Sequence, residues 1–398
     1  MNNTPTFAEG ATRPVWHRTM VSRGRHEGHR VATPLELLFD LCFVVAVAQA
    51  AAGLHHALSA AHFASGVLGY AMAFFAIWWA WMNFTWFASA YDTDDVLYRL
   101  LVFVQIAGVL VLAAGIPRAF EHEDFGLVTL GYVIMRLGLV ALWLRAAVED
   151  PEGRACAVRY AIGVTVVQVG WIARLALPHS AGLAGFLVLV VAELLVPLWA
   201  EHGRPTSWHP HHIAERYGLL TLIVLGESVL ASTVAIQEGL GRGIGTAELL
   251  STSLSGMVIV FSMWWLYFAQ PAHRILTSNR AAFPWGYGHY FVFSSAAAIG
   301  AGLSVVIDYD TGHTRIGPFV AAAAVAVPVA VFLLSVWLVH VRPHRHGRMA
   351  NIDFPVIALL VLLTPLTSVP LPAIALLLIV LVTLTVLVGH RRASSRVA

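Results

Sequence analysis

Lysine is absent from this sequence, and charged residues of any kind are scarce. All 24 basic residues are arginine, and together with 22 acidic residues they make up only 12% of the 398 positions. Soluble chains carry about a quarter charged residues, so this chain has too few to cover a water-facing surface. Because 58% of the residues are hydrophobic, the composition excludes an ordinary cytosolic enzyme and a disordered chain. It indicates a protein whose solvent is lipid.

Cysteine is nearly absent as well. Cys42 and Cys156 lie in apolar surroundings without a pairing motif, so neither a disulfide framework nor a thiolate metal site is expected. The net charge of +2 comes without a basic stripe, which argues against a nucleic-acid partner. The first thirty or so residues are polar and lack the hydrophobic segment of a signal peptide.

The 19 histidines suggest a metal site at first sight, but their spacing does not support one. Most lie in loops and tails, and the run from His209 to His212 lacks the i, i+4 spacing that puts two ligands on one helix face. We expect these side chains at headgroup level or in solvent, and His289 in an interfacial aromatic belt. No nucleophile motif, phosphate loop or dinucleotide fingerprint stands in a usable context. No metal and no cofactor are therefore expected, and a protein that is not an enzyme is favoured.

Long apolar runs separated by polar or Pro/Gly breaks predict an all-α polytopic membrane protein with about twelve transmembrane helices. The predicted spans are 34–56, 64–88, 96–116, 124–147, 156–177, 181–200, 213–236, 246–268, 285–306, 315–341, 352–366 and 371–390. The last two are the weakest, because Pro365, Pro370 and Pro372 interrupt the run. That stretch could also form one broken helix or a re-entrant segment.

The arginines predict the orientation, because cytoplasmic loops carry an excess of positive charge. With the N-terminus in the cytoplasm, 19 arginines fall on the cytoplasmic side and one, Arg136, lies inside a helix. The outer side receives Arg118, Arg174, Arg242 and Arg315. This distribution predicts that both termini are cytoplasmic.

The chain divides into two halves around a short linker. The expected segments are an N-terminal tail at 1–33, the first six helices at 34–200, a cytoplasmic linker at 201–212, the last six helices at 213–390 and a cytoplasmic tail at 391–398. Glu36 and Glu215 open the first helix of each half, and Trp78-Trp79 and Trp264-Trp265 lie in the second. Six crossings return the chain to its starting side, so such halves would be parallel repeats. Chance tryptophan pairs in a tryptophan-rich chain are the alternative.

Glu36 and Asp40 lie on one face of the first predicted helix, one turn apart. Thr33 at N-cap, Pro34 at N1 and Glu36 at N3 match a capping box, which gives Glu36 the task of closing its own helix. Asp40 lies a turn deeper, where a carboxylate costs roughly 2.5–3.5 kcal/mol on insertion scales, so it must face protein or water. It belongs either to a site for a cation, proton or polar headgroup, or to a buried hydrogen bond with a neighbouring helix.

Three further ionisable residues lie near helix centres: Arg136, Glu193 and Glu227. One arginine cannot neutralise both glutamates and Asp40, so the sequence predicts either a protonated carboxylate or a bound cation. Carboxylates in excess over arginine inside a membrane are typical of proton and cation pathways. The alternative is a structural pair between Arg136 and one glutamate, with a neutral glutamate elsewhere.

The connection between the second and third predicted helices concentrates acidic residues on the cytoplasmic side. It reads Tyr-Asp-Thr-Asp-Asp at 91–95, with Arg99 just after. Thr93 can cap the following helix, which places Asp94 and Asp95 at the positive end of its dipole. The other possibility is a contact with a divalent cation or a partner, with Arg99 as internal counter-ion.

Three blocks in this order resemble the bacterial low temperature requirement A (LtrA) family. They are Thr33–Val44 (TPLELLFDLCFV), Tyr91–Arg99 followed by an apolar helix that ends at Gly115-Ile116-Pro117, and Glu215–Ser228 (ERYGLLTLIVLGES). Two departures are mild: Leu38 stands where a second aromatic is more common, and Tyr217 where phenylalanine is. The resemblance implies a polytopic protein of the bacterial inner membrane associated with growth at low temperature, without an established substrate or reaction. The charged residues that it places inside family motifs are Glu36, Asp40, Asp94, Asp95, Arg99, Glu215, Arg216 and Glu227.

Two functional hypotheses follow. The first is a proton- or cation-linked transporter or channel active in low-temperature or envelope stress, with Asp40, Glu193 and Glu227 near the pathway. Arg136 would be the counter-charge, because transporters hold ionisable groups at the membrane midplane between repeats. The alternative is a membrane-embedded lipid-modifying enzyme or a scaffold, with its polar cluster at headgroup depth around residues 92–99. The expected partners are membrane lipid and a proton, a cation or a small solute.

Overall fold

The described part of the protein is a bundle of twelve α-helices. The computed structural model describes residues 15–24, 31–242, 245–344 and 351–397, and none of these residues forms a strand. The helices are α1 Pro34–Ser59, α2 Phe63–Ala90, α3 Val96–His122, α4 Gly126–Glu149, α5 Arg154–Arg174, α6 His179–Ala200, α7 Pro210–Arg242, α8 Thr246–Phe268, α9 Asn279–Asp310, α10 Pro318–Val336, α11 Asp353–Leu363 and α12 Pro370–Val397. Among the described residues, 11 helices are long and apolar enough to cross a membrane, and the apolar stretch Asp353–Leu366 is shorter. Each predicted span overlaps one of these helices, so the predicted fold class is confirmed.

The last two helices are separate elements and not one broken helix. Pro365 lies in a 3-10 turn, Thr364–Leu366, that follows α11, and Pro370 is the first residue of α12. Proline is well tolerated at a helix start, where its missing N–H has no intrahelical partner. With 11 residues, α11 is only about 16 Å long, which is short of the roughly 30 Å hydrocarbon core of a bilayer.

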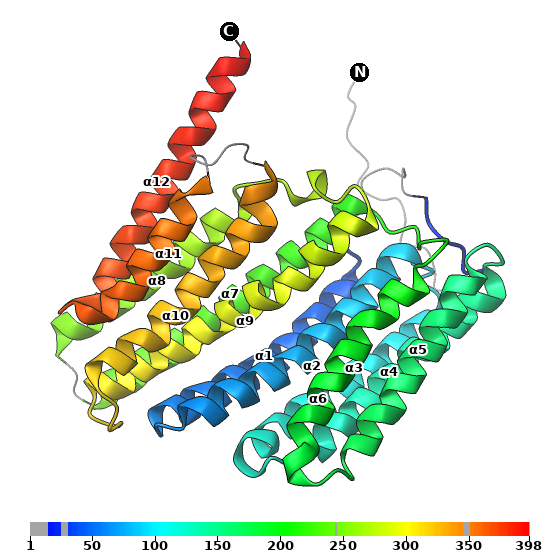
Figure 1. The fold of residues 1–398 in the computed structure, drawn as a ribbon, viewed down its shortest axis with the longest axis horizontal. Coiled ribbons are helices and arrows are strands. Elements are labelled where there is room, and N and C mark those ends of the chain that lie inside the picture. Colours follow the sequence, from blue (N-terminus) through cyan, green and yellow to red (C-terminus); the bar gives the residue numbers. More distant parts are fainter. Residues whose placement is uncertain (1–14, 25–30, 243–244, 345–350, 398) are drawn as a thin grey trace, which may run out of the picture.

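The helices form two groups that meet at α1, α2, α7 and α9 (Figure 1). In the first group α1 packs on α2 and α3, α3 on α4, α4 on α5, and α5 on α6. In the second group α7 packs on α8 and α9, α9 on α10, α10 on α11, and α11 on α12. The beginning of α1 and the end of α12 lie on the same side of the molecule (Figure 1).

The packing of consecutive helices is therefore similar in the two halves, but α8 packs extensively on α12 and α2 has no contact of similar extent with α6. The tryptophan pairs that suggested the repeat do not occupy equivalent surroundings. Trp78 and Trp79 are buried, whereas Trp264 and Trp265 are exposed. The repeat stays a prediction, and any shared ancestry of the halves has not preserved the environment of these pairs.

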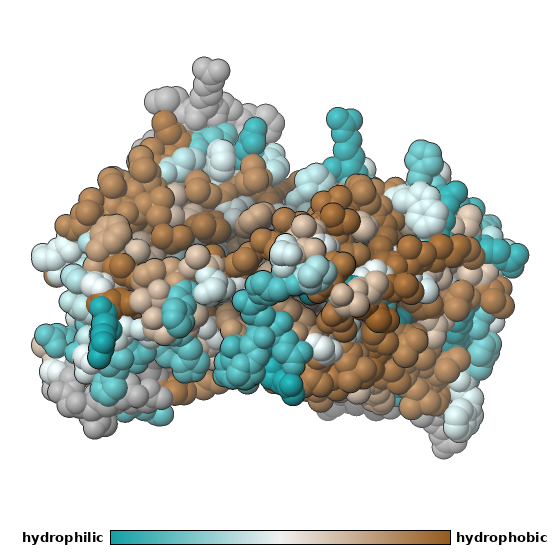
Figure 2. All heavy atoms as spheres, turned by 60° about the horizontal axis from the view of Figure 1, so that its bottom comes forward, coloured by the Kyte–Doolittle hydropathy of each residue, from teal (hydrophilic) through white to brown (hydrophobic). Residues whose placement is uncertain are grey.

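The sides of the bundle are apolar. Leu130, Leu137 and Leu144 on α4 are exposed, and their spacing of seven residues puts them in one stripe along the helix. Figure 2 shows apolar side chains over much of the visible face, with hydrophilic residues along its margins and in a patch that reaches from its lower edge toward the centre. A surface of this kind suits hydrocarbon and not water.

Small residues let α3 and α4 approach closely. A Cβ added at Gly131 would lie 2.4 Å from the backbone nitrogen of Leu112 and 2.6 Å from the carbonyl oxygen of Gly108. Both neighbours are backbone atoms of the facing helix, so they cannot rotate away. Close backbone approach at small residues is a main source of helix association inside membranes.

Gly131→Ala is expected to destabilise the protein by about 1–3 kcal/mol, because the added methyl group forces α3 and α4 apart. Gly182→Ala is the matched control, since its added Cβ meets nothing within 4 Å on α6 and alanine favours a helix over glycine. Thermal unfolding in detergent should show a lower midpoint for Gly131→Ala and an unchanged or higher one for Gly182→Ala. Equal midpoints would contradict the close packing.

Candidate functional site

A buried ion pair joins Arg136 on α4 to Glu193 on α6, near the middle of both helices. Arg136 Nη2 lies 2.9 Å from Glu193 Oε1, and the side chains are 4% and 1% exposed. Trp79 donates its indole N–H to Glu193 Oε2 at 2.7 Å, and Trp171 donates to Oε1 at 3.0 Å. Arg136 also donates to the Tyr132 hydroxyl at 3.1 Å. Side chains of α2, α4, α5 and α6 thus converge on one pair of charges, which we call the central ion pair.

Polar atoms beside the central ion pair are not fully used. Arg136 Nη1 and both polar atoms of the Gln168 amide are buried without a hydrogen-bond partner among the described residues. Gln168 lies three residues before Trp171, on the same face of α5. A buried polar group without a partner costs about 1–3 kcal/mol. Arg136 and Gln168 therefore retain hydrogen-bonding capacity that the described residues do not use.

A large cavity opens where α2, α4 and α6 begin and α3 and α5 end. Its volume is about 610 Å³, and its lining includes Ser65, Asp124, Arg174 and His179. We call it the Arg174 cavity. Its rim carries charged and polar groups of both signs, as a solvent-filled vestibule would.

The Arg174 cavity continues inward. A narrower cavity of about 30 Å³ shares four lining residues with it: Met72, Ala119, Phe125 and Arg174. Tyr132 and Trp171 form part of the inner wall of the narrow cavity, and both are hydrogen-bonded to the central ion pair. The cavities therefore lead from one end of the bundle to the side chains that hold the two charges.

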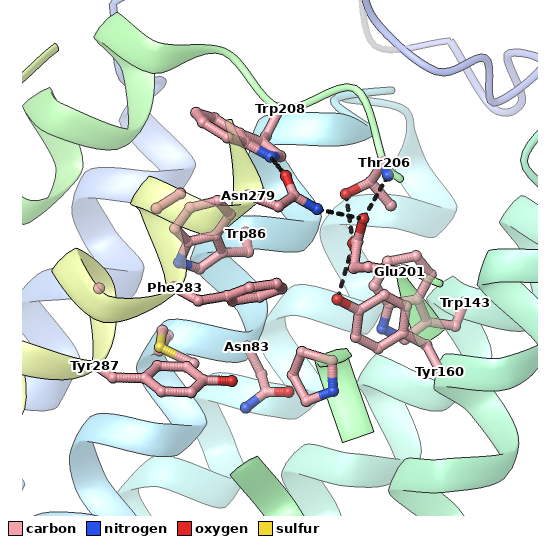
Figure 3. Close-up of a pocket in the computed structure, with 14 residues that line it drawn as sticks. Asn83, Trp86, Trp143, Tyr160, Glu201, Thr206, Trp208, Asn279, Phe283 and Tyr287 are labelled. Atoms are coloured by element: carbon pink, nitrogen blue, oxygen red, sulfur yellow. Dashed lines mark hydrogen bonds between the residues drawn. The ribbon is translucent and has the colours of Figure 1, made fainter. Parts of the chain in front are cut away.

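Another pocket lies at the end of these helices opposite to the Arg174 cavity, and Figure 3 shows it in detail. Its volume is about 30 Å³. Its walls come from α2, α4, α5, α6, α9 and the α6–α7 connection, and we call it the Glu201 pocket. The lining residues are Met82, Asn83, Trp86, Trp143, Tyr160, Pro197, Glu201, Thr206, Trp208, Asn279, Ala282, Phe283, Gly286 and Tyr287.

The central ion pair lies between the two spaces. Along three helices, residues occur in the same order: first one that lines the narrow cavity, then one that belongs to the central ion pair or binds it, then one that lines the Glu201 pocket. The residues in that order are Met72, Trp79 and Asn83 on α2; Tyr132, Arg136 and Trp143 on α4; Phe186, Glu193 and Pro197 on α6. A pair of opposite charges therefore separates two cavities that approach it from opposite ends of the bundle.

A second buried charge cluster joins the two halves. Arg216 on α7 forms two bonds to Asp40 on α1, Nε to Oδ2 at 3.0 Å and Nη2 to Oδ1 at 2.5 Å. Its Nη1 lies 3.0 Å from Glu36 Oε1, which is also 3.1 Å from His212 Nε2. Trp81 donates to Asp40 Oδ1 at 2.7 Å. Because the four charged or ionisable side chains are fully buried, this Arg216 cluster ties α1 and α2 to α7.

The two clusters lie on nearly opposite faces of α2. Trp79 binds Glu193, and Trp81 binds Asp40. Two residues along an α-helix correspond to a rotation of about 200°. The helix α2 thus carries one wall of each cluster.

Comparison with known proteins identifies the family. The sequence pattern of the bacterial low temperature requirement A protein (LtrA) matches residues 31–388. The chain belongs to the LtrA family. An uncharacterized protein of Rhizobium meliloti (strain 1021) is 27% identical to it over 341 residues, which cover 78% of each chain.

The LtrA motif residues of α1 and α7 meet in the Arg216 cluster. The capping box predicted at Thr33 is present: Glu36 Oε2 accepts from the Thr33 N–H at 2.7 Å, and Thr33 Oγ1 accepts from the Glu36 N–H at 3.3 Å. Glu36 uses its other oxygen for Arg216 and His212. Glu215 accepts a hydrogen bond from the Ala32 N–H at 3.3 Å. The first and third motifs therefore build one junction between the halves.

Two expectations about this junction are wrong. Arg216 does not lie on the cytoplasmic flank, because α7 begins at Pro210 and carries Arg216 almost two turns inside, facing α1. Of the three carboxylates expected near the counter-charge Arg136, the structure brings only Glu193 to it within the described residues, as in the alternative of a structural pair between Arg136 and one glutamate. Asp40 pairs with Arg216. Glu227 lies 11 residues beyond Arg216 on α7, which corresponds to about 16 Å along the helix axis. Glu227 is half-buried, and its carboxylate forms no ion pair with a described residue.

The motif between α2 and α3 clamps the segment 15–24. The N-cap of α3 is Asp95 and not Thr93, because Asp95 Oδ1 accepts from the Tyr98 N–H at 2.8 Å. Asp95 also pairs with Arg145 on α4 at 2.5 Å and accepts from the Arg18 N–H at 2.8 Å. Arg99 pairs with Asp94 through two bonds of 2.7 and 2.8 Å. The acidic residues thus act in a cap and in ion pairs.

Asp95→Asn is expected to destabilise the protein at neutral pH by an amount on the order of 2 kcal/mol. Although burial raises the pKa of Asp95, hydrogen bonds from Arg145 and from the N–H groups of Tyr98 and Arg18 lower it from 3.8 to about 2. Asparagine is an equally good N-cap, so the variant isolates the charge. A depressed pKa contributes stability that is complete above about pH 4 and lost as the pH falls through 2. Unfolding midpoints of wild type and variant should therefore differ at pH 7 and converge toward pH 2; a difference independent of pH would contradict the charge effect.

Several residues of the two clusters were missed from the sequence. Trp79 lies in the middle of its span, far from the interface where membrane tryptophans usually lie, and Gln168 is polar inside the span 156–177. Both were available signals for a polar interior. Glu201 carried none, because it lies in the segment predicted as a linker.

The histidine predictions also need correction. His212 is fully buried beside Glu36. His289 is fully buried too, with its Nε2 3.1 Å from the Tyr267 hydroxyl and 3.2 Å from His340 Nε2. The physical reason is helix length: α9 begins at Asn279, not at 285, so His289 lies almost three turns inside the bundle.

Proposed function

We propose that this LtrA protein is a proton- or cation-linked transporter or channel whose pathway runs through α2, α4, α5 and α6. The observation that carries the proposal is the position of the central ion pair between the Arg174 cavity and the Glu201 pocket. A site reached from two ends but open through neither is the arrangement that alternating access requires. The name of the family associates it with growth at low temperature, and we place the transport activity in cold or envelope stress.

In this proposal the central ion pair is the gate and the solute-binding step. Unused polar atoms of Arg136 and Gln168 would receive a solute or a water file beside Glu193. A proton or cation that reaches Glu193 weakens its attraction to Arg136, because the carboxylate then carries less net charge. Arg136 and the two tryptophans that bind Glu193 would then be released, and the closed path between the narrow cavity and the Glu201 pocket would open.

The proposed orientation puts the Glu201 pocket in the cytoplasm and the Arg174 cavity outside, in a bacterial inner membrane. The excess of arginine at the Glu201 end supports it. Thr206→Cys and Leu183→Cys, each in a Cys42→Ser/Cys156→Ser background, test it with a membrane-impermeant thiol reagent. We expect Leu183→Cys to react in intact cells and Thr206→Cys only in inverted vesicles. The reverse pattern would overturn the orientation.

No specific observation favours the lipid-modifying enzyme. The acidic residues that it would use at headgroup depth are engaged: Asp92 with Arg23, Asp94 with Arg99, and Asp95 with Arg145.

Flux from proteoliposomes tests the transport proposal. Protons, monovalent cations and small amines are screened with wild type, with Arg136→Gln/Glu193→Gln, and with Glu152→Gln as control. Glu152 is exposed at the end of the bundle that holds the Glu201 pocket, and among the described residues its ionic partner is Arg204. We expect at least one solute to move, the double variant to lose at least nine-tenths of that flux, and the control to keep it. No flux of any solute, or equal flux in the double variant, would overturn the proposal.

A further inference from the structure

We infer that the Glu201 pocket binds a primary ammonium group. Because this pocket is one mouth of the proposed pathway, the inference rests on the proposed function for its biological meaning. The binding itself is a separate property that equilibrium measurements reveal without flux.

The Glu201 carboxylate is held entirely by neutral donors. Its Oε1 accepts from the Tyr160 hydroxyl at 2.9 Å and the Thr206 hydroxyl at 2.7 Å. Its Oε2 accepts from the Thr206 N–H at 2.7 Å and the Asn279 amide at 3.1 Å. No arginine or histidine side chain of the described residues lies within 4.0 Å of it, and none lines the pocket. Neutral donors fix the carboxylate in place, and the nearest cation that the hydrogen bonds show, Arg159, binds the carbonyl of the adjacent residue His202 and not the carboxylate.

The rest of the pocket suits a cation. Six of its 14 lining residues are aromatic. Two pairs of these rings pack on each other: Trp143 stacks on Tyr160 at 4.2 Å between ring centres, and Trp86 meets Trp208 at 5.1 Å. Aromatic faces attract ammonium ions through their quadrupole, most strongly where water is excluded. A carboxylate that has no direct ionic partner among the described residues, near such rings, favours a cation over a neutral or anionic ligand.

Hydrogen-bond acceptors at the other end of the pocket select an ammonium with N–H groups. Asn83 donates its amide N–H to the Trp79 carbonyl at 2.7 Å, and its side-chain oxygen accepts no hydrogen bond from the described residues. Tyr287 donates its hydroxyl hydrogen to the Leu194 carbonyl at 3.0 Å, which leaves its oxygen as an acceptor. Figure 3 shows Asn83 and Tyr287 at one end of the pocket and the hydrogen-bonded Glu201 carboxylate at the other.

The size of the pocket limits the ligand. A cavity of about 30 Å³ holds about two non-hydrogen atoms, since one water needs roughly 10–15 Å³ on this scale. Methylammonium fits, whereas tetramethylammonium does not and also lacks N–H groups. The same chemistry belongs to the headgroup of an ethanolamine phospholipid. Both sources present one primary ammonium to the pocket.

Tryptophan fluorescence tests the site, because Trp86, Trp143 and Trp208 line it. The full chain in phosphatidylglycerol nanodiscs is titrated with methylammonium chloride, with sodium chloride as the ionic-strength control. We expect a saturable change with methylammonium only, with a Kd in the millimolar range because so small a ligand makes few contacts. Tetramethylammonium should bind at least several-fold more weakly. No saturable change with methylammonium, or equal binding of both ions, would overturn the site.

Variants separate charge from folding. Glu201→Gln should weaken methylammonium binding at least tenfold, and Phe283→Leu should weaken it several-fold while leaving the hydrogen bonds of Glu201 intact. Glu152→Gln, at an exposed carboxylate of the same end, should bind as wild type. If the single variants Glu201→Gln and Phe283→Leu both bound methylammonium as tightly as wild type, the site would be overturned. If one variant folded poorly, unchanged binding in the other would be enough to overturn it.

A second arm identifies the source of the ammonium. In phosphatidylethanolamine nanodiscs a lipid occupant raises the apparent Kd of methylammonium, and an unchanged Kd identifies a free amine as the ligand. Binding with no flux of any solute in proteoliposomes upholds this site and overturns the transport proposal. Flux without methylammonium binding overturns the site and upholds transport.

Discussion

Glu193→Gln is expected to lower the free energy of unfolding by about 3–5 kcal/mol, because it leaves the Arg136 guanidinium as an uncompensated buried charge. The two side chains are 4% and 1% exposed, so water cannot replace the lost carboxylate. Trp79 and Trp171 also lose a charged acceptor, and hydrogen bonds to charged groups are worth more than neutral ones. Thermal and denaturant unfolding in detergent measure the change.

The double variant Arg136→Gln/Glu193→Gln distinguishes a buried charge from a lost packing contact. With both charges removed, the desolvation cost disappears, so we expect it to recover at least half of the stability lost in Glu193→Gln. Glu152→Gln should be indistinguishable from wild type, because exposed pairs contribute about 0–1 kcal/mol. A double variant that is less stable than Glu193→Gln would show that the pair stabilises the fold by its contacts alone.

The helices and the candidate charges could be predicted from sequence because both follow from the cost of burying polar groups in lipid. Apolar runs located all twelve helices, and the price of intramembrane charge singled out Asp40, Arg136 and Glu193. The partners could not be predicted. Helical periodicity fixes which residues share a face, but it does not say which other helix that face meets.

Arg216 shows this limit most clearly. It lies near a predicted helix end and close to three histidines, where arginine normally marks the cytoplasmic flank. Only the actual start of α7 at Pro210 and the packing of α7 on α1 bring it to Asp40. Glu201 shows a second limit: its significance comes from six aromatic side chains on four helices and one connection that no local pattern brings together.

The central ion pair and the Arg216 cluster are both buried charge clusters, but their surroundings differ. The first lies between cavities at two ends of the bundle. The second is a compact network between the halves, with each Asp40 oxygen bonded to Arg216. In the function that we propose, the first moves solute and the second holds the two halves together.

Arg216→Met is accordingly expected to have the largest effect on stability, a loss of about 5 kcal/mol or more, because it strands both Asp40 and Glu36 as buried carboxylates. Arg216→Lys should lose less, since it keeps the charge but not the planar two-point contact with Asp40. Arg204→Met is the control, because Arg204 is exposed and, within the part of the chain that the structure describes, pairs with the exposed Glu152 alone. It should change stability by less than about 1 kcal/mol.

Unfolding in detergent measures these differences, and limited proteolysis between α6 and α7 reports separation of the halves. We expect cleavage in Arg216→Met under conditions where wild type and Arg204→Met stay intact, because α7 loses its charged contacts with α1 and α2. Arg216→Lys should be cleaved at an intermediate rate. If Arg216→Met and Arg204→Met melted together and resisted protease equally, the cluster would not hold the halves together, and the apolar contacts of α1 with α7 and α9 would have to do so alone.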